Sequence, residues 1–285
     1  QGPEEYIEPT DFAVFDEEVI IYDQFRSDMK YYDLEGKLKY QKRTPFLFLN
    51  FFMFDSNHYI FQMPGTGNGH LRTIANSYVF ESDSSFVLTG MAFSRDDARI
   101  NDIISNNFYF YNNKAFYNQP YSDTIYSIAP DHKIQIEYII DFHDKKMPSD
   151  MLLKSNEEEF YSLLKTGRYA NFTGNYVLTK DYLYFHYSLG GLLHRCFYSK
   201  KTKKLITGNG FMNDINFIFP LDIVLTAVDN NVLVGYMQSY YIGENFERNT
   251  REEWVKQLGE KYVQIAENIK KEDNPIILFF KFKEF

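Results

Sequence analysis

The sequence contains one cysteine, no long apolar run and no basic stripe, and each shortage excludes a class of protein. Cys196 has no partner for a disulfide within the chain, so the fold is not a disulfide framework, and we expect a packed structural thiol rather than a nucleophile. No run of eighteen apolar residues occurs, so we expect no membrane-spanning helix. A basic stripe is also missing, and a net charge of −9 repels phosphate backbones, so nucleic acid is not an expected partner.

Aromatic residues are abundant instead. The 285 residues include 28 Phe and 24 Tyr, which bring the aromatic content to 19%. Such a chain has ample material for a packed core, and this argues against disorder. The bias toward Phe and Tyr, with few alanines, favours strands over helices.

A hairpin pattern repeats along the chain. Residues 121–142, YSDTIYSIAPDHKIQIEYIIDF, hold two strand-like runs around the polar break APDHK, and residues 30–40, 77–88 and 195–207 have the same form. We place the turn of 77–88 at ESDSS. The last turn residues, Lys37, Ser85, Lys133 and Lys204, then lie 48, 48 and 71 residues apart. A period in the forties that contains strands and turns is typical of β-propeller blades.

Another predicted hairpin precedes each of these four, at residues 11–24, 50–64, 108–120 and 176–189. A fifth unit begins at 215–238 and closes with the C-terminal NPIILFFKFKEF. Each of the first four units therefore supplies four strands, a, b, c and d, whereas the fifth changes character after its first hairpin. The prediction is an all-β fold: one propeller domain over residues 1–285, built of four-stranded antiparallel blades, five of which are visible.

Two helical insertions are expected. The first spans about 156–166, with Asn156 and Glu159 as a capping box and Gly167 as its end, and it accounts for the long third interval. The second spans about 250–271, with Thr250 and Glu253 as a capping box. Its apolar stripe is expected to pack against the propeller rather than to dock a partner, and comprises Trp254, Leu258, Tyr262, Ile265 and Ile269.

Three segments carry a resemblance to a known family: GPEEY (2–6), SDTIYSI followed by YIIDF, and the terminal DNPIILFFKFK. The chain resembles the uncharacterised six-bladed β-propeller lipoproteins of Bacteroidetes. The resemblance implies an exported protein of the periplasm, outer membrane or cell surface, with any lipid anchor outside this chain. In that family a further blade precedes GPEEY. Either a sixth blade is missing from this sequence, or residues 1–9 and the terminal strands close a five-bladed ring.

Strand parity divides the connections between two ends of the blades. The b–c and d–a connections are long and chemically rich, whereas the a–b and c–d turns are short and are interpreted as scaffold. Ligand contacts are therefore expected from the end that carries the b–c and d–a connections. Arginine and histidine side chains there can bind acidic groups of a ligand, and a tyrosine ring can stack on it. The predicted ligand-binding residues are Arg26, His70, Arg72, Arg95, Asp97 and Tyr121. The alternative is that Arg95, Asp97 and Arg99 pair with one another on a solvated rim.

No catalytic or metal motif is visible. No two histidines show the HExxH spacing, and the Gly-x-Ser-x-Gly elbow is missing, so neither a metal nor another cofactor is expected. A calcium site built from several blades stays open. The leading hypothesis is a non-enzymatic module that binds a small molecule, glycan, peptide or protein. The alternative is a propeller hydrolase or lyase that acts on glycans or lactones at the channel mouth, with carboxylates from separate blades.

Overall fold

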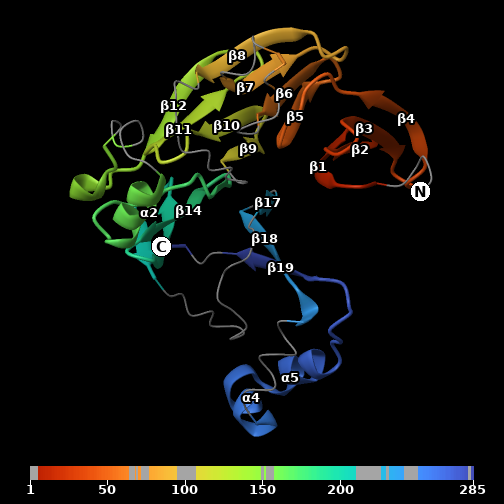
Figure 1. Ribbon diagram of the computed structural model, residues 1–285. Coiled ribbons are helices and arrows are strands. Elements are labelled where there is room, and N and C mark those ends of the chain that lie inside the picture. The colour runs from red at the N-terminus through yellow and green to blue at the C-terminus, as the bar shows by residue number, and fades with distance from the viewer. Residues whose placement is uncertain are drawn as a thin grey trace. The chain divides into compact units, whose positions relative to one another are not determined.

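The computed structural model describes residues 6–63, 68, 70–71, 77–94, 107–148, 151, 157–209, 226–228, 231–240, 250–281 and 284–285 (Figure 1). Within these ranges the chain is mainly strand, as the aromatic composition predicts. Among the same residues, no helix is both long and apolar enough to cross a membrane.

Four of the five sheets in this part of the chain are four-stranded antiparallel meanders, with neighbouring strands in sequence order. Blade 1 comprises β1 (Pro9–Phe15), β2 (Glu18–Asp23), β3 (Asp28–Asp33) and β4 (Leu38–Arg43). Blade 2 comprises β5 (Asn50–Asp55), β6 (His58–Gln62), β7 (Ser77–Ser82) and β8 (Leu88–Ser94). Blade 3 comprises β9 (Phe108–Tyr111), β10 (Lys114–Asn118), β11 (Thr124–Ile128) and β12 (Ile134–Ile139).

Blade 4 comprises β13 (Tyr176–Leu178), β14 (Tyr182–Leu189), β15 (Leu192–Ser199) and β16 (Leu205–Gly208). The fifth sheet is three-stranded and comprises β17 (Thr226–Val228), β18 (Val232–Met237) and β19 (Ile276–Lys281). The all-β prediction is therefore confirmed, as are the four-stranded form and the hairpins of blades 1–4, whereas the last sheet has three strands among the described residues.

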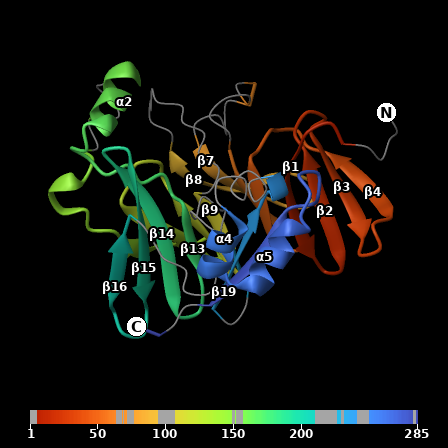
Figure 2. The same cartoon turned by 90° about the horizontal axis from the view of Figure 1, so that it is seen from below.

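The first helical insertion is confirmed, and the second differs from its prediction. After the short 3-10 helix η1 (His143–Lys145), α2 spans Glu157–Lys165 and is followed by Gly167 at φ +69°; Asn156 lies outside the described residues. In place of one helix over 250–271, α4 (Arg251–Leu258) and α5 (Glu260–Glu267) lie side by side (Figure 2). Gly259 at φ +81° separates them.

The break at Gly259 changes which helical residues are buried. The capping box of Thr250 and Glu253 forms as predicted. Beyond Gly259 the helical phase shifts, so that Val263 and Ala266 are buried while Ile265 is 50% exposed. The predicted stripe is therefore wrong at Ile265; Trp254 and Ile269 are half-buried, and the side chains of Leu258 and Tyr262 lie outside the description. As expected, the helices connect two strands of the last sheet.

One predicted turn is displaced. The c–d turn of blade 2 runs over 83–87 rather than over ESDSS, because β7 continues to Ser82. Two backbone hydrogen bonds close it, from Asp83 N to Val87 O (3.0 Å) and from Phe86 N to Asp83 O (3.0 Å). With Val87 as the marker, the first two intervals become 50 and 46 residues. Glu81, assigned to a turn from the sequence, is therefore a strand residue.

The chain divides into two compact units. Unit 1 comprises Gln1–Asn175 and Ser188–Gly191, and unit 2 comprises Tyr176–Tyr187 and Leu192–Phe285. In unit 1, blade 2 buries both of its faces. Alternate residues of β5 enter different clusters: Phe51 and Met53 pack with blade 1, and Phe52 and Phe54 pack with blade 3. Strand alternation thus gives each of the two junctions in unit 1 its own aromatic core.

Candidate functional site

Three of the predicted ligand-binding residues belong to b–c connections of unit 1. Arg26 lies between β2 and β3, His70 between β6 and β7, and Tyr121 between β10 and β11. Arg72, Arg95 and Asp97 lie outside the described residues. The three described residues of the predicted set therefore all lie in b–c connections, as strand parity predicts.

The connection that carries Arg26 is organised by the buried carboxylate of Asp23. Its oxygens accept hydrogen bonds from the backbone N–H groups of Ile7 (2.8 Å), Glu8 (3.3 Å) and Arg26 (3.2 Å). Burial acts to raise the pKa of Asp23, but these hydrogen bonds together with the charge of Arg26 lower it below its usual value. Asp23 therefore serves as a fixed anion that shapes this loop.

His70 and Tyr121 differ in exposure. His70 is exposed, and its Nε2 lies 3.3 Å from the carbonyl oxygen of Pro45 in the neighbouring d–a connection. Tyr121 is only 8% exposed, and its ring packs edge-to-face on Phe160 of α2 at 4.8 Å. The face of Tyr121 that we expected to stack on a ligand is therefore covered by the protein's own helix.

Three side-chain amides cluster in blades 2 and 3, at the end of the strands that carries the b–c and d–a connections. Gln62, Asn107 and Asn118 are 3%, 2% and 0% exposed. Gln62 Nε2 donates to Asn107 Oδ1, and Asn107 Nδ2 donates to the Asn118 carbonyl at 3.0 Å. Among the described residues, Gln62 Oε1 and Asn118 Oδ1 have no hydrogen-bond donor. The cluster is therefore rich in buried acceptors.

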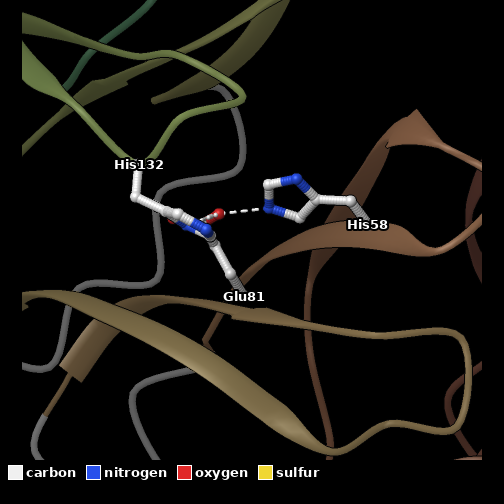
Figure 3. Close-up of side chains that lie close together, drawn as sticks. All are labelled: His58, Glu81 and His132. Carbon is white, nitrogen blue, oxygen red and sulfur yellow. Dashed lines mark hydrogen bonds and ion pairs between the residues drawn. The ribbon is translucent and has the colours of Figure 1, made fainter.

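A second cluster lies at the opposite end of the strands, and the sequence analysis missed it. His58, Glu81 and His132 converge from blades 2 and 3 (Figure 3). His132 Nδ1 lies 2.8 Å from Glu81 Oε2, and His58 Nε2 forms a hydrogen bond with the same oxygen. The two imidazole rings are 4.9 Å apart. Two imidazoles and one carboxylate are groups that can ligate a metal ion.

Local structure explains how these side chains meet. His58 begins β6 directly after the a–b turn, and Glu81 lies on the adjacent strand β7. His132 is in the c–d turn of blade 3, which a hydrogen bond from its backbone N–H to Ala129 O (2.9 Å) closes. The sequence signal was weak because 23 and 51 residues separate Glu81 from the two histidines. A search for short motifs cannot detect such spacing.

Repeated four-stranded antiparallel meanders make this protein a β-propeller, in which each blade is one sheet. Within that class, the chain belongs to the family described as Domain of unknown function (DUF4934), whose model matches residues 1–281.

A solved structure supports the same fold. The chain is similar to a protein of Bacteroides fragilis NCTC 9343 that is described as exported, with 17% identity, a TM-score of 0.74, and coverage of 100% of this chain and 80% of that chain. A DUF4221 family member from Bacteroides vulgatus ATCC 8482 has 9% identity, a TM-score of 0.48 and coverage of 83% and 74%. BamB from Moraxella catarrhalis has 10% identity, a TM-score of 0.39 and coverage of 80% and 61%. No curated protein matches the chain.

Proposed function

We propose that this protein is an exported, non-enzymatic binding propeller of the cell envelope. Its ligand, a glycan, peptide or partner protein, would be held at the b–c and d–a end of the blades. In this proposal the protein lies in the periplasm or at the outer surface of the cell. It also belongs to the six-bladed Bacteroidetes group. Support for export comes from the fold shared with the B. fragilis protein that is described as exported.

The amide cluster of Gln62, Asn107 and Asn118 carries the binding part of the proposal. A buried acceptor without a donor costs about 1–3 kcal/mol, so the two amide oxygens favour a donor-rich occupant. Sugar hydroxyls and peptide N–H groups are such donors. Gln62 directly precedes the β6–β7 connection, which also supplies the exposed imidazole of His70.

The other predicted contacts complete this end. In the proposal, Arg26 and His70, with Arg72, Arg95 and Asp97, bind the polar or acidic groups of the ligand through charge-assisted hydrogen bonds. Tyr121 contributes by packing on Phe160, which fixes the β10–β11 connection against α2, rather than by stacking on the ligand.

A thermal-shift screen with glycans, peptides and metabolites tests the proposal, followed by titration of each hit. We expect Arg26→Ala and His70→Ala each to weaken binding about tenfold, the equivalent of about 1.4 kcal/mol. Lys37→Ala is the matched control, because Lys37 is an exposed cation in the c–d turn of blade 1 and should leave affinity unchanged. Equal effects of all three substitutions, or turnover of a bound ligand, would overturn the proposal.

A further inference from the structure

We propose that His58, Glu81 and His132 bind one divalent transition-metal ion, zinc in the first place, and leave one coordination position open to solvent. The proposal is independent of the binding function above, since this cluster lies at the a–b and c–d end of the strands. All three residues belong to unit 1.

The donor chemistry selects the class of metal. Imidazole nitrogen suits zinc, iron, copper and nickel, whereas magnesium and calcium prefer sites made of oxygen ligands alone. Two histidines with one carboxylate are a known set for zinc with an open position. The same donors also suit iron(II).

The distances fit a single ion. The three donor atoms all lie within 4.8 Å of one another, with Glu81 Oε2 between the two imidazole nitrogens. Ligand atoms about 2.0–2.1 Å from a tetrahedral zinc ion lie about 3.3–3.4 Å from each other. Binding of one ion would therefore move Glu81 Oε2 away from the two imidazole nitrogens and bring those nitrogens closer together, through rotation of the side chains.

The burial of the three side chains is graded. Glu81 and His58 side chains are 6% and 14% exposed, whereas His132 is 50% exposed. Glu81 and His58 thus form the floor of the site, and His132 closes it from the solvent side. Within the described residues the cluster holds three protein donors, so a water molecule or a ligand atom would complete a tetrahedral shell.

Two features of the backbone build the site. Gly90 pairs with Glu81 across the β7–β8 ladder, and a Cβ atom there would lie 3.4 Å from Glu81 Oε1 and 3.6 Å from His132 Nδ1. These are ordinary van der Waals distances, so Gly90 lies directly beside two of the donor residues. His132 has φ +63°, a left-handed conformation that glycine adopts more easily, and Gly36 occupies the corresponding turn position in blade 1. The strained position thus holds a potential ligand.

The test is zinc titration of tag-free, chelator-treated protein by calorimetry, with metal content measured by mass spectrometry after dialysis. We expect one equivalent of zinc per chain. Cobalt(II) should give the intense visible absorption of a four-coordinate ion. His132→Gly should lower zinc affinity at least tenfold, and because glycine suits φ +63°, its far-UV circular dichroism should be unchanged. Glu81→Gln should lower affinity similarly.

His143→Gly is the matched control. His143 also has a positive φ (+51°) and a carboxylate partner, Asp141, at 3.1 Å, but it lies outside the three-donor cluster. This variant should bind zinc like the unsubstituted protein. The proposal is overturned if the unsubstituted protein retains no stoichiometric zinc, if His132→Gly binds zinc equally well, or if His143→Gly loses it. The first outcome would identify the cluster as a hydrogen-bonded contact between blades 2 and 3.

Discussion

Asp11 is a described residue whose ionisation should affect stability. Its Oδ2 accepts a hydrogen bond from the backbone N–H of Phe51 at 2.8 Å and so links blade 1 to blade 2. Burial raises the pKa of this carboxyl to about 6, against the hydrogen bonds from Phe51, Phe12 and Asn50, which lower it. The folded protein therefore holds this proton at pH values where the unfolded chain has released it.

The sign of the pH dependence follows. Between about pH 4 and pH 6 the folded state binds more protons at Asp11 than the unfolded state, so the free energy of unfolding falls as the pH rises. Asp11→Asn keeps an acceptor for Phe51 N–H and removes the charge. We expect it to stabilise the protein at pH 7 by on the order of 1 kcal/mol and to flatten this slope. Urea unfolding at pH 4.5, 5.5 and 7 measures both effects.

Asp131→Asn is the control for this prediction. Asp131 is exposed, and its hydrogen bond with Lys133 lowers its pKa, so its substitution should not stabilise the protein at pH 7. A slope that persists unchanged in Asp11→Asn would show that other groups cause the pH dependence.

Glu81 shows at the same scale why the candidate metal site could not be predicted. ESDSS resembles a polar turn, and only the backbone hydrogen bonds of 83–87 show that Glu81 belongs to the strand. His58 and His132 were visible in the sequence, but their approach depends on the packing of blade 2 against blade 3. Packing between blades leaves no local spacing in a sequence.

Turns and connections differ in how much space they leave for a side chain. Two glycines with similar backbone conformations, Gly36 and Gly174, illustrate the difference. A Cβ atom added at Gly36 (φ +83°) would have no other atom within 4 Å, whereas a Cβ at Gly174 (φ +88°) would lie 2.3 Å from Asn107 Cβ and 2.8 Å from its Cα. Gly36→Ala should therefore cost about 1 kcal/mol, the strain of a left-handed alanine. Gly174→Ala must also displace β9, and we expect a loss of about 3 kcal/mol or more.

Urea unfolding of both variants at pH 7 measures these losses. Because Asn107 belongs to the amide cluster, Gly174→Ala should also weaken any ligand that binds at the b–c end, while Gly36→Ala should not. Equal destabilisation by the two substitutions would show that β9 moves aside without cost. The close approach of Gly174 to Asn107 would then have no energetic role.

At the scale of elements, local patterns predicted the strands well and the helices less well. Alternation and turn residues are properties of a few neighbouring positions, so the hairpins of blades 1–4 were predicted correctly within the described residues. The helix over 250–271 was predicted from spacing that assumes an unbroken helix, and Gly259 at φ +81° interrupts that spacing. The displaced turn at 83–87 has a comparable cause, since Phe86 resembles a strand residue but adopts φ +62°.

At the scale of the whole molecule, blade 2 determines how unit 1 unfolds. Phe61, which is fully buried, belongs to the core shared with blade 1, while its neighbour Ile60 belongs to the core shared with blade 3. Because the two residues are adjacent on one strand, loss of either core removes a face of β6 from its packing. The three blades of unit 1 should therefore unfold as one cooperative unit.

Phe61→Ala tests this cooperativity. The cavity in the blade 1 junction should cost about 3–5 kcal/mol. Phe61 belongs only to the core on the blade 1 side. If unit 1 is cooperative, amide protection in hydrogen exchange should nevertheless fall by the same free energy in β3 of blade 1 and in β11 of blade 3. Phe12→Ala is the control, because Phe12 is 65% exposed on β1 and should cost less than about 0.5 kcal/mol. Protection lost in β3 but retained in β11 would instead show that each blade opens separately. The two aromatic cores would then be energetically independent, although one strand contributes to both.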